Sequence, residues 1–177
     1  TGVINILKAM GSDIQILREY IAGGEPVADI RVRHAQLRGI NIPEEQVPLA
    51  IDEFPTLFIA ASCAEGTTVL SGAEELRVKE SDRIQTMADG LAVLGVNHEV
   101  KPDGIVIHGF GVNGKFSSGT INSHGDHRIA MSFAVASLLA SEPIDILNTA
   151  EVATSFPNFL AVAAAAGLNV QTGDGRQ

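Results

Sequence analysis

Three segments of the chain repeat one pattern of apolar and polar positions. Each has an amphipathic stretch, then a glycine, then a short alternating run, and the glycines Gly11, Gly95 and Gly167 are 84 and 72 residues apart. In the second segment the apolar residues of 84–94 recur at helical spacing, Gly95 is typical of a left-handed helix cap, and the alternation after it predicts a strand. The shared pattern therefore predicts helices that end at these three glycines, with strands over 13–16, 96–100 and 168–171.

A second pair of segments extends the repeat. Residues 51–55 lead into an apolar run over 57–64, and residues 125–128 lead into an apolar run over 129–140. A β-type stretch follows each run, at 67–70 and 144–147. Each unit then holds two helices and several strands, which predicts an α/β repeat of roughly 70–80 residues. The first unit begins directly in its helix, so we expect the chain to start inside a unit.

Composition and charge exclude several classes of function. The 177 residues are 45% hydrophobic and 19% charged, which is typical of about one folded domain. A net charge of -9 makes the chain a poor binder of nucleic acid or of an anionic membrane. No apolar stretch approaches the roughly 18 residues of a membrane span. The single cysteine, Cys63, excludes an internal disulfide, and its apolar neighbours favour a buried small side chain.

The most densely charged loop lies between the first of these β-type stretches and the helix that ends at Gly95. It contains Arg77, Lys79, Glu80 and Arg83, and we expect Ser81 to be the N-cap of the helix. An extended loop would place Arg77 and Lys79 on one side. A helix N-terminus flanked by Lys and Arg suits a phosphate or a carboxylate. A solvated loop with capping acids is the alternative.

Two further loops enter helices with charged residues. Asp52 and its acidic neighbour precede a proline that fits a first helical turn, and Asp126, His127 and Arg128 precede the long apolar run. Helix capping by the acids explains both loops equally well. If the three helix N-termini converge, they form an anion pocket with carboxylates beside it. A metal site is weakly supported, because two histidines three residues apart, His124 and His127, have no third ligand at a helical interval.

Three stretches of this chain resemble one enzyme family. They are Leu-Arg-Val-Lys-Glu-Ser-Asp-Arg at 76–83, Asp-His-Arg-Ile-Ala-Met at 126–131 and Ser-Phe-Pro at 155–157. In this order they resemble the C-terminal part of 5-enolpyruvylshikimate-3-phosphate (EPSP) synthase, or 3-phosphoshikimate 1-carboxyvinyltransferase, over essentially the whole chain. The resemblance implies repeated βαβαββ units in an inside-out α/β barrel. We therefore expect residues 1–171 to form a partial C-terminal domain with an incomplete first unit, residues 172–177 to be a polar tail, and the N-terminal domain to lie outside the chain.

The resemblance also implies an activity. A cytoplasmic transferase of this family moves the carboxyvinyl group of phosphoenolpyruvate to the 5-hydroxyl of shikimate-3-phosphate, releases phosphate, and needs neither cofactor nor metal. Asp52 would face that hydroxyl as a base, Glu80 would act as acid and base on the phosphoenolpyruvate methylene, and Lys79 would contact the hydroxyl or assist proton transfer. The N-terminal domain supplies most contacts to shikimate-3-phosphate, so the isolated chain is expected to be inactive. A non-catalytic anion-binding or interaction module of the same fold is the alternative.

The basic residues complete the implied site. Arg83 and Arg128 would clamp the carboxylate and phosphate of phosphoenolpyruvate, and His127 would support the same corner. Two positions depart from many members of the family. Thr154 stands where a lysine precedes Ser-Phe-Pro, which removes one implied phosphate contact, and Glu-Leu at 75–76 replaces Asn-Trp. Both departures resemble the second sequence class of the family, which includes herbicide-tolerant forms.

Overall fold

The computed structural model describes residues 2–173, and the middle of the chain forms a complete βαβαββ unit. Its first strand is short: Arg38 and Asn41 form isolated parallel bridges with Glu65 and Val69. The elements that follow are α2 (Phe54–Cys63), β3 (Glu65–Leu70), α3 (Arg83–Val93), β4 (Asn97–Lys101) and β5 (Gly104–Phe110). Strand β5 pairs antiparallel with β3 on one side and β4 on the other. The repeat predicted from the sequence is confirmed in this unit.

The flanking units contain parts of the same order of elements. The first contains α1 (Gly2–Ala9) and the antiparallel pair β1 (Asp13–Ala22) and β2 (Glu25–Arg33). The third contains β6 (Gly119–Asn122), α4 (His127–Ala136), β7 (Ile144–Leu147), α5 (Ala150–Ser155) and α6 (Phe159–Ala165), with β6 and β7 parallel. Short 3-10 helices are η1 (Glu44–Gln46), η2 (Pro48–Ala50), η3 (Glu74–Val78) and η4 (Ser137–Leu139).

The strand predicted over 168–171 is wrong. These residues follow α6 without joining any ladder of the described chain. Alternation of side chains creates a face that suits a sheet, but the strand itself forms only when a neighbour takes its backbone hydrogen bonds. Residues 174–177 of the predicted polar tail lie outside the described residues.

The three repeat glycines end their helices in the same way. Gly11, Gly95 and Gly167 have φ of 95°, 77° and 95°, a left-handed conformation that glycine adopts without steric cost. In each case the N–H of the next residue donates to the carbonyl five positions before it, over 2.9–3.0 Å. This is the Schellman pattern, which confirms the predicted caps.

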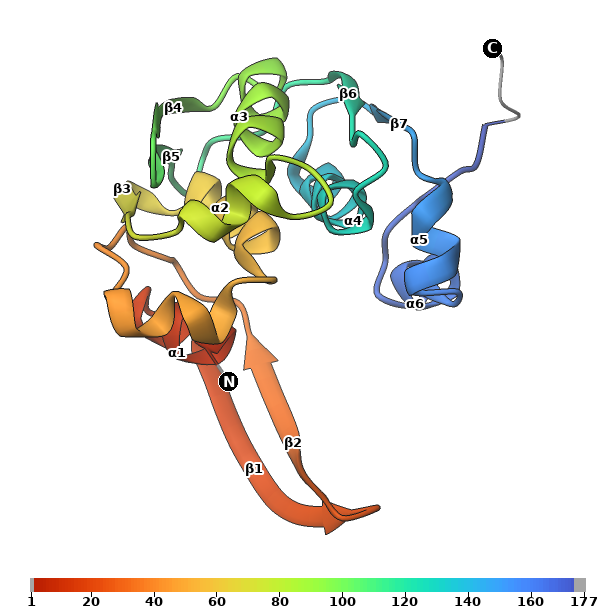
Figure 1. The fold of residues 1–177 in the computed structure, drawn as a ribbon. Coiled ribbons are helices and arrows are strands. Elements are labelled where there is room, and N and C mark those ends of the chain that lie inside the picture. Colours follow the sequence, from red (N-terminus) through yellow and green to blue (C-terminus); the bar gives the residue numbers. More distant parts are fainter. Residues whose placement is uncertain (1, 174–177) are drawn as a thin grey trace.

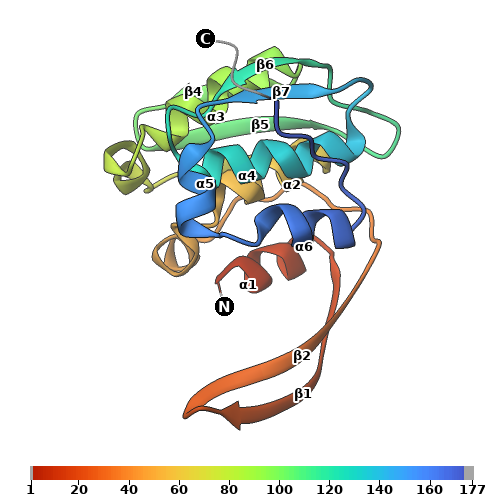
Figure 2. The same cartoon turned by 90° about the vertical axis from the view of Figure 1, so that its right-hand side faces the viewer.

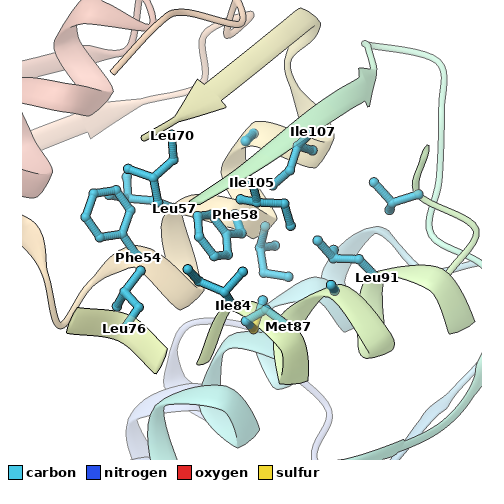
Figure 3. Close-up of a cluster of buried hydrophobic side chains, with 14 of the residues drawn as sticks. Phe54, Leu57, Phe58, Leu70, Leu76, Ile84, Met87, Leu91, Ile105 and Ile107 are labelled. Carbon is cyan, nitrogen blue, oxygen red and sulfur yellow. The ribbon is translucent and has the colours of Figure 1, made fainter. Parts of the chain in front are cut away.

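The core lies where α2, α3 and α4 pack on one another, with the sheets outside them. Helix α2 contacts α3, α4 and β5, while α3 contacts β4 and β6. Figure 3 shows apolar side chains of α2, α3, β3 and β5 meeting in this interior. Cys63 is half-buried rather than buried, and desolvation by burial raises the pKa of its thiol to about 11. The packing brings the N-terminal ends of the three helices together, as the ion pairs described below demonstrate.

The β1–β2 hairpin projects away from this body (Figures 1 and 2). Its apolar side chains are largely in solvent: Ile21 is 69% exposed, Val32 66% and Leu17 56%. Neither outer edge of the hairpin pairs with another strand of residues 2–173. The rest of the described chain therefore leaves most of the hairpin uncovered.

Candidate active site

Helix α3 begins with a charged loop that is not extended. Residues 74–78 form η3, in which Arg77 turns away from the predicted cluster. Its guanidinium donates to the carbonyls of Lys101 and Pro102, at 2.6 Å each, and to Asp82 Oδ2 at 2.7 Å. The extended loop that would place Arg77 and Lys79 on one side is therefore not formed, because residues 74–78 wind into a 3-10 helix. Arg77 fastens the loop to the β4–β5 turn.

The N-cap of α3 is Asp82 rather than Ser81. Asp82 Oδ1 accepts a hydrogen bond from the N–H of Gln85 at 3.0 Å. The Ser81 hydroxyl donates instead to Asp126 Oδ2 at 3.1 Å, 45 residues along the chain. The predicted cap is wrong by one position, since the helix starts at Arg83 and a tertiary partner occupies the serine.

The acids before α2 and α4 behave differently from each other. Glu53 occupies the cap position of α2 but makes no side-chain cap hydrogen bond, so capping does not explain the pair Asp52 and Glu53. Asp126 does cap α4, because its Oδ1 accepts from the N–H of Arg128 at 3.0 Å and of Ile129 at 3.5 Å. The capping interpretation is therefore wrong for the first loop and confirmed for the second.

Arg83 is the centre of the charged cluster. It is the first residue of α3, and its side chain is only 1% exposed. Its Nε donates to Asp126 Oδ2 at 2.8 Å. Its Nη1 donates to Asp52 Oδ1 at 3.0 Å, and its Nη2 to Glu80 Oε2 at 2.5 Å. One guanidinium thus joins three carboxylates from the loops before α2, α3 and α4.

The buried pair of Arg83 and Asp126 is held in its charged state. Desolvation alone would raise the pKa of Asp126, but the hydrogen bond and charge of Arg83 outweigh it and lower that pKa. Desolvation alone would lower the pKa of Arg83, and the carboxylates, Asp126 first, outweigh it and raise that pKa. Both groups are therefore ionised at neutral pH.

Asp52 also contacts two further cations, Lys79 and Arg128, at the exposed edge of the cluster. Lys79 Nζ lies 4.0 Å from Asp52 Oδ1 and also pairs with Glu75. Arg128 Nη1 donates to the carbonyl of Asp52 at 3.0 Å, and its Nη2 lies 3.7 Å from Asp52 Oδ2. The side chains of Arg128 and Asp52 are 35% and 43% exposed, so this edge is open to a ligand.

An open hollow of about 360 Å³ adjoins the cluster. Glu80 forms part of its wall, together with Asp82, Asp89 and His124. His124 has φ of 52°, which is uncommon for a residue with a side chain. Glu80 therefore pairs with Arg83 through its carboxylate and also lines this open hollow.

The net charge of the cluster is negative. Three cations, Lys79, Arg83 and Arg128, face five carboxylates, Asp52, Glu53, Glu75, Glu80 and Asp126. Each cation already has an acidic partner. An anionic ligand would therefore need to displace a carboxylate, or to meet additional positive charge from outside these residues.

Residues 2–173 contain neither a cluster of metal ligands nor a membrane-spanning helix. That part of the chain contains no group of three or more histidine, cysteine, aspartate or glutamate side chains that could hold a metal ion. None of its helices has the length and apolar character that a bilayer crossing requires.

Comparison with known proteins assigns the chain to a family. The family model for EPSP synthase (3-phosphoshikimate 1-carboxyvinyltransferase) matches residues 1–162. The chain belongs to the EPSP synthase family. The 3-phosphoshikimate 1-carboxyvinyltransferases of Methylococcus capsulatus and Nitrosococcus oceani are 62% and 61% identical to it over 171 and 173 residues. These matches cover 97% and 98% of this chain, but 38% of each relative.

A solved structure agrees with this assignment. EPSP synthase from Acinetobacter baumannii superposes with a TM-score of 0.93 at 59% identity, over 97% of this chain and 40% of that chain. The enolpyruvyl transferase fold implied by the sequence motifs is thereby confirmed. The chain spans about two fifths of the length of the relatives that it matches.

Within this EPSP synthase fold, the predicted site residues meet with one exception. Asp52, Lys79, Glu80, Arg83 and Arg128 share one network of ion pairs. His127 begins α4 but forms no side-chain hydrogen bond or ion pair with the described residues.

The sequence interpretation missed two members of the network. It assigns Asp126 as the cap of α4 and Ser81 as the cap of α3 and gives neither residue a place in the network, although the Ser81 hydroxyl donates to Asp126 across it. The residue types were visible, but no local signal links positions 45 residues apart.

Proposed function

We propose that residues 1–171 of this chain form the C-terminal part of a 3-phosphoshikimate 1-carboxyvinyltransferase. The whole protein would transfer the carboxyvinyl group of phosphoenolpyruvate to the 5-hydroxyl of shikimate-3-phosphate and release phosphate. Family membership supports this activity. The observation that carries the proposal is that one arginine holds two half-exposed carboxylates, Asp52 and Glu80, beside the accessible Arg128.

The two carboxylates match the proton transfers of this reaction. Asp52 takes the proton of the attacking hydroxyl, while Glu80, once it has taken up a proton, gives that proton to the methylene carbon of phosphoenolpyruvate. The new C–O bond forms at the adjacent cationic carbon. Glu80 then removes a proton from the methyl group as the C–O bond to phosphate breaks. Both side chains are about half exposed, which gives them access to a ligand.

The cations match the anionic groups of phosphoenolpyruvate. Arg128 has the planar fork that binds a carboxylate or phosphate through two hydrogen bonds, and it lies at the open edge of the network. Lys79 lies within ion-pair distance of Asp52, where it can contact the hydroxyl under attack. The predicted ligand contact of Arg83 stays a prediction, since that side chain is 1% exposed and already binds three carboxylates.

The charge balance of the site favours a source of positive charge outside these residues. Because five carboxylates face three cations, these residues alone would bind a trianionic ligand poorly. We propose that an N-terminal domain of the same polypeptide closes over the network, bringing positive charge and the contacts to shikimate-3-phosphate. The chain by itself is then expected to release no phosphate from phosphoenolpyruvate and shikimate-3-phosphate.

A chimera tests the activity. The chain is joined to the part of the Methylococcus capsulatus relative that lies outside the match, and phosphate release is measured for the chimera and for the chain alone. We expect activity from the chimera only. A folded chimera without activity would contradict the proposed function, and activity of the chain alone would contradict the need for a second domain. The non-catalytic alternative predicts that the chimera binds phosphoenolpyruvate without turnover.

The role of Glu80 has its own test in the chimera. Glu80→Gln removes the proton-transfer group while preserving size, so kcat should fall by about 10²–10⁴-fold, as for other general acids and bases. Glu74→Gln is the matched control, because it removes the same charge from an exposed position in η3. A loss of less than about 3-fold for Glu80→Gln would contradict the proposed role.

A further inference from the structure

Asp126 is a buried carboxylate to which the proposed reaction gives no step. Its side chain is 0% exposed, and both of its oxygens are occupied. Oδ1 accepts from two backbone N–H groups at the start of α4, and Oδ2 accepts from Ser81 and from Arg83 Nε. One carboxylate thus joins the first turn of α4 to the first residue of α3.

Arg83 transmits this constraint to the two proposed proton-transfer groups. Its guanidinium is planar, so fixing the direction of Nε–H restricts the positions that Nη1 and Nη2 can take. Those two nitrogens hold Asp52 Oδ1 at 3.0 Å and Glu80 Oε2 at 2.5 Å. Asp52 and Glu80 are themselves 43% and 53% exposed, so the buried anchor of the cluster is the Arg83–Asp126 pair.

We propose that Asp126 is a positioning residue. It orients the Arg83 guanidinium, and through it sets where the carboxylates of Asp52 and Glu80 lie. This proposal rests on the proposed function, because the placement of those two carboxylates matters for catalysis only if they transfer protons.

The competing role is that of a plain helix cap. Asparagine caps helices about as well as aspartate does, because either side-chain oxygen can accept the N–H groups of the first turn. Asp126→Asn therefore keeps the cap of α4 and removes the negative charge that faces Arg83. If Asp126 only caps, this substitution changes nothing else. If it positions Arg83, the guanidinium loses its buried charged partner.

The first experiment follows the Nε–H proton of Arg83 by NMR in the complete 177-residue chain. In the unmodified chain this proton should exchange with water at least about tenfold more slowly than the Nε–H of exposed arginines, since it is buried and hydrogen-bonded. Asp126→Asn should remove most of this protection. Asp82→Asn, the matched control, neutralises the cap of the neighbouring helix, whose second oxygen binds Arg77, and should leave the Arg83 signal unchanged.

Two results of this NMR experiment would overturn the proposal. One is fast exchange of the Arg83 proton in the unmodified chain, a measurement that needs no variant to fold. The other is full protection retained in folded Asp126→Asn.

The second experiment measures kinetics in the chimera described above. Asp126→Asn should lower kcat on the order of 10–100-fold, as expected for a displaced proton-transfer group, with a smaller change in KM for phosphoenolpyruvate. An unchanged kcat despite a lost Arg83 signal would refute the positioning role. If the unmodified chimera is itself inactive, the proposed function fails, and the NMR result alone then decides whether Asp126 orients Arg83.

Discussion

Replacing Arg83 with methionine should destabilise the chain strongly. Methionine fills much of the same volume, so the main change is the loss of the guanidinium from a site that is 1% exposed. Asp126, at 0% exposure, would then keep only neutral donors, the Ser81 hydroxyl and two backbone N–H groups. Removing one member of a buried ion pair typically costs about 3–5 kcal/mol. That is a large share of the roughly 5–15 kcal/mol by which a domain is stable.

The double variant Arg83→Met/Asp126→Asn separates the charge from the packing. If the penalty of the single variant comes from a buried unpaired carboxylate, neutralising Asp126 should restore more than half of the lost stability. Replacing both members of a buried pair is often close to neutral, whereas removing one is costly. Arg77→Met is the matched control: Arg77 also pairs with a capping aspartate, but the two side chains are 26% and 38% exposed. Its ion pair is expected to contribute about 1 kcal/mol or less.

The effect should also depend on pH. Arg83 lowers the pKa of Asp126 below its usual value of 3.8. The stability from this pairing is therefore fully present above about pH 4 and is lost as the pH falls through the lowered pKa. In Arg83→Met, desolvation is expected to raise the pKa of Asp126 instead. Protonation then removes the free-energy cost of a buried, unpaired carboxylate charge. The difference in stability between the unmodified chain and Arg83→Met should shrink on acidification.

Urea unfolding followed by far-UV circular dichroism provides the assay. The unmodified chain, Arg83→Met, Arg77→Met and the double variant Arg83→Met/Asp126→Asn are compared at pH 7 and pH 3. A loss below about 1 kcal/mol for Arg83→Met at pH 7 would refute the reasoning, because it lies within the range of exposed pairs. A double variant no more stable than Arg83→Met would refute it as well.

Three further predictions concern the ligand, the core and the hairpin. In the chimera, Arg128→Lys should raise KM for phosphoenolpyruvate, since losing a charged hydrogen bond costs about 1.5–3 kcal/mol; unchanged kinetics would place Arg128 outside the site. Gly90→Ala should destabilise the chain by about 1–3 kcal/mol in urea unfolding, because its Cβ would overlap the Phe133 ring; unaltered stability would mean that the ring moves freely. The chain should self-associate through the open edges and apolar side chains of β1–β2, as sedimentation at two concentrations would detect, and Ile21→Lys should weaken this; a concentration-independent monomer would contradict it.

The sequence alone determined the features that short-range interactions control. The glycine caps depend on hydrogen bonds that span five residues, so the spacing of apolar residues and glycines predicted them correctly at Gly11, Gly95 and Gly167. Asp126 as the cap of α4 is equally local, because its partners are two and three residues away. The order of helices and strands in the middle unit followed from the same patterns.

Only the tertiary structure decided how the charged residues combine. Arg83 meets Asp126 across 43 residues and Asp52 across 31, and nothing in the local sequence distinguishes it from an exposed arginine. Ser81 does not cap α3, because its hydroxyl donates to Asp126, which is distant in the sequence but close in space. Residues 168–171 alternate like a strand but lack a partner among the described residues. Side-chain pattern sets which face an element can bury, whereas a ladder or a buried ion pair exists only when packing delivers the second partner.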